Sequence, residues 1–541
     1  MTVAENSHLY ADEQNGFRKK RSCIDHIFTM SSIIRNRKNR NLPTYIAFVD
    51  LEKAFDRVDR NLLLYKLKSM GFGGKMFNII QSLYSNCQAC VNVNGHLTNF
   101  FPSEYGVRQG DALSPTLFGL FINDLAHDLR ACNSGIWAGD FFLCSLFYAD
   151  DLALISDSEE KLQEMISTLY TWCRKWRMRV NVTKTKIVHF RVKSQTKSTY
   201  KFMYGTDEIE IVDKYKYLGI ILDEYLDFDT TSSVLAGSGG RALGAVYSKF
   251  CKLKGLGYRT YTKMYEAGVI PILDYCSGVW GFKSFGKINT IQNRAIRFFL
   301  GVHSFAPNLA INGDMGWVSC HIRRKIEMIR FWNRMIALED NRLTKKIFMW
   351  DTEIRKQNWS SEIYKIFQEI NQEQHYNGMT PVDIKSARQK LCDLENNAWR
   401  ETVVTTPKLR TYTRYKFEYS TEPYVHNVFN RGHRSILAQF RSGILPLKVE
   451  TGRFTNIPVE FRLCIFCEEN VVEDEEHFLF GCSFYRDERR VFFNNVSESC
   501  LDFYNLSSDD KFNVLMKADI VKQTAAFLYC SYIKRRDMLY N

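Results

Sequence analysis

Residues 147–152 have the sequence Phe-Tyr-Ala-Asp-Asp-Leu, which places two adjacent aspartates between two apolar stretches. The apolar residues on both sides predict two short strands, so Asp150 and Asp151 are expected in the turn of a β-hairpin. Neighbouring side chains in a regular strand point to opposite faces, whereas at a tight turn both can reach toward one spot. An Asp-Asp pair in a turn can also simply face water, but a solvated turn rarely has hydrophobic strands on both sides.

A third aspartate, Asp50, follows a short apolar stretch at residues 45–49 that predicts a buried strand. If the end of this strand lies beside the turn, Asp50, Asp150 and Asp151 can hold two Mg²⁺ ions about 4 Å apart. Two such ions suit phosphoryl transfer, which depends mainly on positioning and on the stabilisation of charge. The three aspartates are therefore candidate metal ligands.

The pattern around these aspartates predicts an α+β domain, because strands and helices alternate from residue 45 to about residue 222. Asn94-Gly95 lies between two strand-like stretches and is the strongest short signal for a β-hairpin. Residues 114–129 predict a helix, with Ser114 as its N-cap and a proline in the first turn.

The composition fits a large protein with an anionic partner. The chain has 541 residues, of which 45% are hydrophobic, and its net charge is +13. Lys and Arg gain affinity for nucleic acids by displacing counterions from phosphates, although a basic surface can also serve solubility. Residues 232–445 are mostly helical by pattern and include basic faces such as Arg323-Arg324-Lys325.

The sequence predicts an intracellular protein, in the nucleus, the cytoplasm or both. Its 15 cysteines are scattered, which is typical of reduced thiols rather than of a disulfide framework. The N-terminal residues lack the apolar core of a signal peptide, so we do not expect secretion. No run of about 18 apolar residues occurs, so we expect neither a transmembrane segment nor a membrane partner.

Six segments resemble the motifs of reverse transcriptases from non-LTR (LINE-type) retroelements, in the order of that family. They are Gln-Asn-Gly-Phe-Arg at 14–18, Ala-Phe-Val-Asp-Leu-Glu-Lys-Ala-Phe-Asp at 47–56, Gly-Val-Arg-Gln-Gly-Asp-Ala-Leu-Ser-Pro at 106–115, Tyr-Ala-Asp-Asp at 148–151, Trp176 with Asn181, Lys184 and Thr185, and Tyr-Lys-Tyr-Leu-Gly at 215–219. Only 49 residues precede Asp50, and further finger motifs of the family are missing, so we expect an N-terminally truncated member.

The resemblance implies a right-hand polymerase fold of class α+β, with a palm, partial fingers and a helical thumb. A mainly helical C-terminal region with a small zinc knuckle would follow. The domains expected on this basis are fingers and palm at 1–225, a thumb-like region at 226–305, a helical linker at 306–455, a CCHC module at 456–490 and a helical tail at 491–541.

The resemblance also implies roles for individual residues at the metal site. Asp50, Asp150 and Asp151 would be the catalytic ligands of two Mg²⁺ ions, for which Mn²⁺ is a possible substitute. Lys184 would protonate the leaving pyrophosphate, or it is a solvated lysine. Phe55 would exclude the ribose 2′-hydroxyl, or it is a core phenylalanine at the start of a helix.

The family's nucleotide and primer contacts fall on two further segments. Gln109 and Gly110 would line the incoming nucleotide and the template base, and glycine would allow the close approach. Tyr215, Leu218 and Gly219 would support the primer strand.

The function implied is RNA-directed DNA polymerisation, in which dNTPs are added to the 3′-hydroxyl of a DNA primer or target on an RNA template. Two alternatives remain. One is a catalytically inactive, nucleic-acid-binding remnant of such an element. The other is a group II intron-type maturase, against which the LINE-type segment at 47–56 and the late cysteine cluster argue.

A late cluster of cysteines has the spacing of a zinc site. Cys464-x₂-Cys467-x₉-His477-x₄-Cys482 supplies three thiolates and one imidazole, which suit tetrahedral Zn²⁺. The alternative is that these are incidental cysteines of a core. Four neighbouring arginines are expected to contact phosphates: Arg462, Arg486, Arg489 and Arg490.

Overall fold

The computed structural model describes Glu5 and residues 9–540, and the chain divides into two compact units. Unit 1 comprises residues 1–231, 276–282 and 327–382, and unit 2 comprises residues 232–275, 283–326 and 383–541. This division does not coincide with the boundaries expected at 305 and 455. Residues 327–382 join unit 1 because their helices pack on it across a long sequence separation, which local patterns do not reveal.

Unit 1 contains a four-stranded antiparallel sheet in the order β10–β1–β9–β8. Its strands are β10 (Lys186–Phe190), β1 (Thr44–Asp50), β9 (Asp151–Ser156) and β8 (Ser145–Tyr148). The strand predicted at 45–49 is confirmed, and the mixture of strand and helix agrees with the α+β class.

The two faces of this sheet have different coverings. Ala47 and Val49 of β1 belong to a hydrophobic core with Leu169 of helix α8 (Glu159–Trp176). Phe48 points to the other face, where its ring stacks on Tyr215 with centroids 4.5 Å apart. Both faces are therefore buried, as the continuous apolar run in β1 requires.

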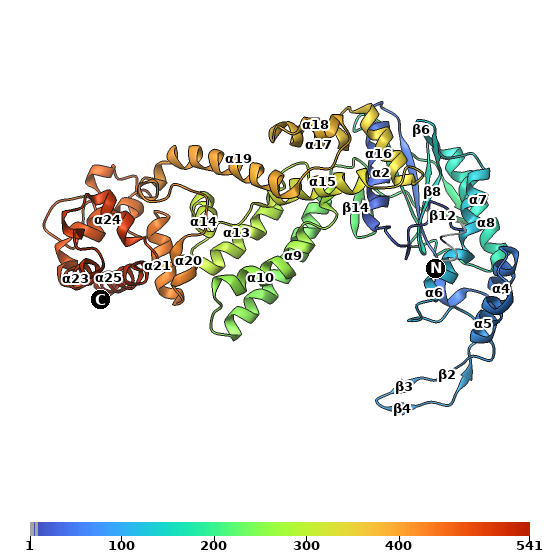
Figure 1. Ribbon diagram of the computed structural model, residues 1–541, viewed down its shortest axis with the longest axis horizontal. Helices are drawn as coiled ribbons and strands as arrows, with labels where there is room; N and C mark the ends of the chain where they lie inside the picture. Colours follow the sequence, from blue (N-terminus) through green and yellow to red (C-terminus); the bar gives the residue numbers. More distant parts are fainter. Residues whose placement is uncertain (1–4, 6–8, 541) are drawn as a thin grey trace. The chain divides into compact units, whose positions relative to one another are not determined.

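Two local predictions in unit 1 had different outcomes. The β3–β4 hairpin (Asn92–Val93 and His96–Leu97) is confirmed, and both turn residues, Asn94 and Gly95, have positive φ. Figure 1 shows this hairpin extending away from the helices before it. The predicted N-cap role of Ser114 is wrong: α6 (Ser114–Phe121) begins at that residue, and its hydroxyl donates to the Arg108 carbonyl at 2.5 Å.

A long helix of unit 1 is fixed by residues from much later in the chain. Helix α2 (Cys23–Lys38) packs beside α16 (Leu343–Ile354). Asn36 donates to the buried Asp351 at 2.9 Å, and Asp25 forms an ion pair with Arg334 at 2.8 Å. These buried polar contacts tie the segment at 327–382 to the N-terminal part of the unit.

The remaining elements of unit 1 surround the sheet. They are α3 (Ala54–Arg57), α4 (Arg60–Ser69), α5 (Gly74–Tyr84), β2 (Gln88–Ala89), β5 (Phe101–Pro102), α7 (Asn123–Ala131), β6 (Ile136–Ala138), β7 (Phe141–Leu143), β11 (Phe202–Tyr204), β12 (Asp207–Ile209), β13 (Lys214–Tyr217), β14 (Ile220–Asp223), α12 (Ser277–Trp280), α17 (Trp359–Glu369) and α18 (Glu373–Asn377). Helix α15 (Cys320–Ile336) belongs partly to each unit.

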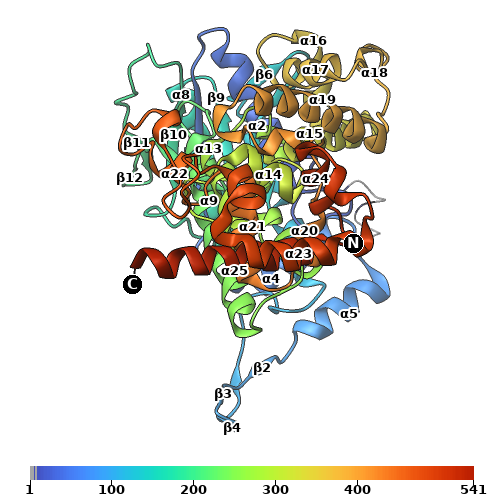
Figure 2. The same ribbon diagram turned by 90° about the vertical axis from the view of Figure 1, so that its left-hand side faces the viewer.

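Unit 2 is helical over most of its length. Its elements are α9 (Asp229–Lys252, from residue 232), α10 (Tyr258–Gly268), α11 (Ile270–Leu273), α13 (Gly286–Leu300), α14 (Asn308–Met315), α19 (Ile384–Val404), η1 (Pro407–Leu409), η2 (Tyr412–Arg414), α20 (Pro423–Asn427), α21 (Arg431–Arg441), α22 (Lys448–Thr451), η3 (Val459–Phe461), η4 (His477–Gly481), η5 (Ser483–Tyr485), α23 (Arg486–Ser499), η6 (Phe503–Asn505), α24 (Ser508–Leu515) and α25 (Val521–Tyr540). Helices α21 and α23 both pack on the long α25 (Figure 2).

Buried ion pairs connect the helices of unit 2. Arg441 forms two hydrogen bonds with Asp314, at 2.9 and 2.8 Å, and both residues are almost fully buried. The basic face expected at Arg323-Arg324-Lys325 is wrong, since Arg324 is fully buried and Arg323 pairs with Asp274 at 2.9 Å. A run of basic residues suggests a solvent-exposed face when only the sequence is known, because acidic partners on other elements are not visible in the local pattern.

No helix in the described part of the chain has the length and apolar character needed to cross a membrane.

Candidate functional site

The register of the sheet brings the first and third aspartates together. Asp50, the last residue of β1, is directly opposite Asp151, the first residue of β9. Asp50 lies two residues after Phe48 on β1, so its side chain lies on the same face, which carries Tyr215 and not α8. Asp151 is paired with Asp50 across the strands and therefore lies on that face too. Because strands β1 and β9 are hydrogen-bonded along their whole length, the positions of these two carboxylates are fixed by the sheet.

The turn between β8 and β9 holds the second aspartate. It consists of Ala149 and Asp150, because Tyr148 and Asp151 are already paired as strand residues. Ala149 has φ of +58°, a left-handed conformation that is unusual for a residue with a side chain. The hairpin predicted from the sequence is therefore present, but Asp151, which was expected in the turn, is the first residue of β9.

The negative charges of the Asp50, Asp150 and Asp151 carboxylates repel one another. Partial burial, together with the charges of Asp150 and Asp50, raises the pKa of Asp151 to about 6. Burial, with a contribution from Asp50, also raises the pKa of Asp150. A bound cation would relieve this repulsion, so the donor set fits the hard, oxygen-ligated Mg²⁺ ion.

The segment after α8 supports the end of β1. Thr185 Oγ1 accepts a hydrogen bond from the Asp50 amide at 3.2 Å, and the Asn181 amide donates to the Asp50 carbonyl at 2.8 Å. Lys184 lies between these contacts with an exposed side chain, and it forms no ion pair within 4.0 Å among the described residues. Asn181 and Thr185 thus have a positioning role that sequence reasoning did not assign to them.

The segment at 106–110 lies beside the helix that follows β1. Val107 donates to the Phe55 carbonyl at 2.9 Å, and Gln109 Nε2 donates to Asp56 at 2.8 Å. Gly106 has φ of +82°, and a Cβ there would lie 2.9 Å from the Asp56 backbone. The two segments can pack this closely only because residue 106 is a glycine.

Gly110 lies at the open end of this segment. It is exposed, its φ is +86°, and a Cβ added there would meet no atom within 4 Å. The protein itself therefore does not require a small residue at this position, although the backbone conformation favours glycine. That combination is compatible with an approaching ligand.

The surroundings of Phe55 agree in part with each of its two interpretations, as a residue that excludes the ribose 2′-hydroxyl and as a core phenylalanine. Its ring stacks on the buried Phe118 with centroids 4.5 Å apart, yet the side chain remains half-buried. The residue is therefore packed on one face and accessible on another.

The last sequence-predicted segment of this site forms the β13–β14 turn. Leu218 and Gly219 both have positive φ, which defines a tight hairpin turn. Tyr215 stacks on Phe48, which lies on the same face of β1 as Asp50. Burial raises the pKa of Tyr215, with the charges of Asp151 and Asp50 as further causes. Tyr215 belongs to the same region as the three aspartates.

The Cys₃His residues converge in unit 2. The ligand atoms of Cys464, Cys467, His477 and Cys482 all lie within 4.8 Å of one another. Two sulfurs, those of Cys464 and Cys482, are 3.8 Å apart, and the Cys467 sulfur is 3.4 Å from His477 Nε2. Sulfurs of a tetrahedral site with Zn–S bonds of about 2.3 Å are about 3.8 Å apart, so the residues fit Zn²⁺.

The surroundings of this cluster correct one expectation. Arg489 is buried and donates to the carbonyls of Leu479 and Cys482 at 2.9 and 2.8 Å. Its predicted phosphate contact is wrong, because its guanidinium satisfies backbone groups around the cluster. Arg486 and Arg490 are exposed.

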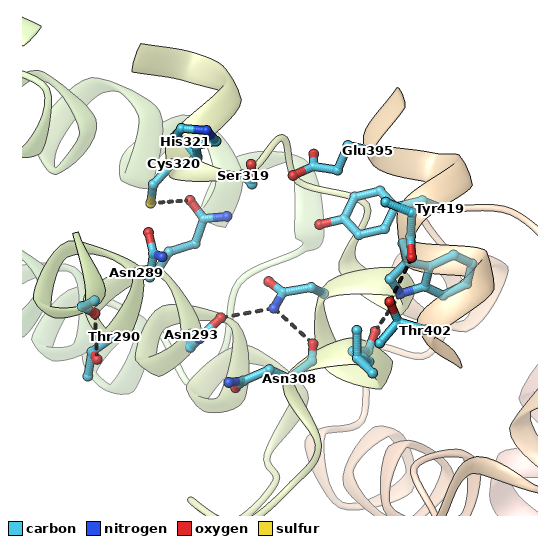
Figure 3. Close-up of a pocket in the computed structure, with 16 residues that line it drawn as sticks. Asn289, Thr290, Asn293, Asn308, Ser319, Cys320, His321, Glu395, Thr402 and Tyr419 are labelled. Atoms are coloured by element: carbon cyan, nitrogen blue, oxygen red, sulfur yellow. Dashed lines mark hydrogen bonds between the residues drawn. The ribbon is translucent and has the colours of Figure 1, made fainter. Parts of the chain in front are cut away.

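Unit 2 also contains a cavity of about 580 Å³. Figure 3 shows Asn293 of α13 on the side of α14 that carries Asn308, with Glu395 of α19 on another wall. Asn312 Nδ2 donates to Asn293 Oδ1 at 3.0 Å and to the Asn308 carbonyl at 2.8 Å. No Lys or Arg is among the described residues that line it, so the cavity does not suit a triphosphate. The candidate site for chemistry is accordingly the one around Asp50, Asp150 and Asp151.

Comparison with known families agrees with this geometry. Residues 2–222 match the family described as reverse transcriptase (RNA-dependent DNA polymerase). That range contains the four-stranded sheet, all three aspartates and the β13–β14 turn. The N-terminal part of the chain is therefore a reverse transcriptase domain.

Curated relatives define the kind of reverse transcriptase. The chain is 25% identical over 351 residues to a probable RNA-directed DNA polymerase from transposon BS of Drosophila melanogaster, covering 62% of this chain and 38% of the relative. It is 26% identical to the RNA-directed DNA polymerase from the mobile element jockey of Drosophila funebris, covering 58% and 35%. The R2DM retrotransposable element of Drosophila melanogaster is 27% identical over 223 residues, covering 40% and 21%. The domain belongs with those of non-LTR retrotransposons, and the matched part of the chain spans only 38%, 35% and 21% of the length of these three relatives.

Solved structures of telomerases were also matched, with low similarity. Telomerase from Candida albicans in complex with a fragment of telomeric RNA has a TM-score of 0.33 at 12% identity, covering 71% of this chain and 57% of that one. Apo telomerase from Candida tropicalis has a TM-score of 0.29 at 15% identity, covering 41% of each chain. The family assignment rests on the sequence comparisons.

Proposed function

We propose that the protein is an RNA-directed DNA polymerase of a non-LTR retroelement. The observation that carries this proposal is the pairing of Asp50 with Asp151, with Asp150 in the adjoining turn, inside a domain of the reverse transcriptase family. The reaction is nucleotidyl transfer from a dNTP to the 3′-hydroxyl of a primer.

The three aspartates would hold two Mg²⁺ ions, or Mn²⁺ in their place. Bound there, the ions would activate the 3′-hydroxyl and stabilise the charge on the triphosphate. Asp50 and Asp151 are held by the strand register, which keeps their carboxylates oriented before any substrate arrives. The exposed ammonium of Lys184 would donate a proton to the leaving pyrophosphate.

The neighbouring segments would orient the nucleotide and primer. Gln109 and Gly110 would line the incoming nucleotide, and the accessible face of Phe55 would occupy the space of a ribose 2′-hydroxyl. Tyr215, Leu218 and Gly219 would support the primer end. The stack of Tyr215 on Phe48, on the sheet face that carries Asp50 and Asp151, supports this last assignment.

A basic surface of unit 2 supports an RNA template and a DNA primer or target as partners. Residues 245–260, 294–305 and 424–435 contain no Asp or Glu. They contribute Lys249, Lys252, Lys254, Arg259, Arg294, Arg297, Arg431 and Arg434, of which Arg434 is buried. We call this set of three segments the basic surface.

Contacts between the three segments show that they are neighbours. The Arg431 guanidinium lies 4.8 Å from the Phe298 ring centroid and 5.7 Å from that of Phe250. Phe429, largely exposed, approaches Gly257. Cations interleaved with accessible aromatic rings fit a nucleic-acid strand, whose phosphates and bases they can both contact.

The Cys₃His cluster is proposed to bind one structural Zn²⁺. Four ligands from the protein would leave no position for water, so the site would not be hydrolytic.

A primer-extension assay tests the proposed function. The protein should extend oligo(dT) on poly(rA) in Mg²⁺, and Asp150→Asn should abolish extension while keeping the fold, because a charge is lost with little change in volume. Circular dichroism of both proteins controls for folding. A wild-type protein that binds template but does not extend would instead identify an inactive, nucleic-acid-binding remnant.

A further inference from the structure

A short N-terminal segment lies along the edge strand of the sheet. The Phe147 amide donates to the Glu13 carbonyl at 2.9 Å, and the Asn15 amide donates to the Phe147 carbonyl at 2.8 Å. These two bonds form a parallel bridge between Gln14 and Phe147. The segment therefore ends beside the turn that carries Asp150.

The side chain of Gln14 bonds directly to that turn. Its Oε1 accepts hydrogen bonds from the amides of Ala149, at 3.1 Å, and Gly16, at 2.9 Å. Gln14 is 2% exposed, so water cannot replace either bond without opening the structure. Ala149 is also the residue with positive φ, and its amide is thus held in a conformation that it would rarely adopt alone.

Gly16 allows this close approach. A Cβ at position 16 would lie 2.3 Å from the Ala149 nitrogen, so any side chain there would require the turn to shift. The carboxamide of Gln14 and the bare backbone of Gly16 therefore contact the same peptide group of the turn.

We propose that Gln14 is a positioning residue that fixes the Ala149 amide and so directs the Asp150 carboxylate toward the metal site. This inference rests on the proposed function. Asp150 is in a two-residue turn, whereas Asp50 and Asp151 are held by strand pairing. Its backbone consequently depends on contacts made to the turn from outside the hairpin, and the Gln14 bond is such a contact.

The direct test replaces Gln14 by residues of similar size. Gln14→Met removes the acceptor, whereas Gln14→Glu keeps an oxygen in its place. Gln14 Nε2 has no hydrogen-bond partner among the described residues, so the Glu substitution removes no other hydrogen bond. Each variant is titrated with Mn²⁺, followed by electron paramagnetic resonance of the free ion, and the Mg²⁺ concentration for half-maximal extension is measured separately.

Gln14→Met should weaken Mn²⁺ binding and raise the half-maximal Mg²⁺ concentration by about ten-fold or more, because a catalytic group moved by about 1 Å can lose about a hundred-fold. Gln14→Glu should restore both values most of the way to wild type. Asn15→Ala is the matched control: this buried side chain accepts from Arg21 at 2.9 Å and does not bond to the turn. It should lower the melting temperature without changing either metal value.

A second variant decides the matter if Gln14→Met does not fold. Gly16→Ala drives a Cβ into the Ala149 nitrogen and should displace the turn from the other side, again weakening metal binding. Metal values equal to wild type in whichever of the two variants folds would overturn the positioning role. A wild-type protein that fails to extend primers refutes the proposed function instead, and the Mn²⁺ titration still tests Gln14.

Discussion

The charged Asp151 carboxylate destabilises the metal-free fold, although the proposed metal site requires it. Its pKa of about 6 in the folded protein exceeds the ordinary value of about 3.9, chiefly because partial burial disfavours the charged form. The folded state therefore binds the proton more tightly than the unfolded state does. The contribution of this group favours folding below pH 4 and is lost as the pH rises to about 6.

Asp151→Asn should consequently stabilise the metal-free protein at pH 7 and abolish primer extension. Removing the repulsion is expected to raise the melting temperature by about 1–3 °C, discounted for the solvent exposure of this side chain. Differential scanning calorimetry in EDTA measures the shift, and the difference from wild type should vanish at pH 4. Asp207→Asn, at an exposed position of β12, is the control and should change neither stability nor extension. A destabilised Asp151→Asn protein would contradict the electrostatic account.

Phe55→Val tests the other proposed side-chain role in the nucleotide site. Removing the ring should open space near the ribose and ease incorporation of ribonucleotides, lowering the preference for dNTPs by about ten-fold or more. Loss of the stack on Phe118 should also cost some stability. Single-nucleotide incorporation kinetics with dTTP and UTP measure the preference. Phe77→Val, at a partly buried position in α5, controls for lost aromatic packing, and equal preferences in both variants would place the gate elsewhere.

At the level of secondary-structure elements, those determined by local sequence patterns could be predicted, whereas those determined by contacts with distant residues could not. Strand β1, strand β10 and the β3–β4 hairpin were predictable because their signals are local: apolar runs and Asn94-Gly95. The three aspartates could be named as candidate metal ligands because they end or join such strands. Their register, which pairs Asp50 with Asp151, required the structure.

Other features could not be predicted because distant partners determine them. Nothing in the sequence near Gln14 indicates that its side chain bonds to a turn 135 residues later. The buried state of Arg324 likewise depends on neighbouring helices, and the packing of α16 on α2 joins segments more than 300 residues apart. Ser114 was misassigned because its hydroxyl has a partner in the preceding loop, at Arg108, and not in the first helical turn.

The lysines of the basic surface are predicted to contribute to RNA binding. Replacing Lys249, Lys252 and Lys254 together by Gln should weaken RNA binding, since each phosphate contact contributes counterion release. The slope of log K against log salt should become shallower by about 2 for a single strand. Fluorescence anisotropy with a labelled oligoribonucleotide at several salt concentrations measures both quantities.

An equal loss of charge elsewhere in unit 2 provides the control. Lys511, Lys517 and Lys522 lie in or near α24 and α25, among several acidic residues. Their replacement by Gln should leave the affinity and the salt slope close to wild type. Equal effects of the two triple variants would show that net charge, and not the basic surface, governs binding.

On the scale of the whole molecule, the Cys₃His cluster is part of the packing of unit 2 and not an isolated knuckle. Glu473, between its second and third ligands, forms a buried pair with Arg535 of α25 at 2.8 Å. The next acidic residue but one, Glu475, pairs with Arg410 at 2.8 Å. Zinc would therefore stabilise contacts reaching from α25 to the segment before α21.

Removal of zinc should accordingly destabilise unit 2 and leave unit 1 folded. Cys467→Ser breaks the ligand set, so the purified protein should contain no zinc, and the melting transition of unit 2 should fall by several degrees. Template affinity should decrease, because the basic surface belongs to the same unit. Extension at saturating template should be spared, because the three aspartates lie in unit 1. Cys530→Ser, at an exposed position of α25, is the control and should retain zinc. Zinc content, calorimetry and anisotropy report on these outcomes separately, so a Cys467→Ser protein with full template affinity and an unchanged transition would identify the cluster as ordinary core cysteines.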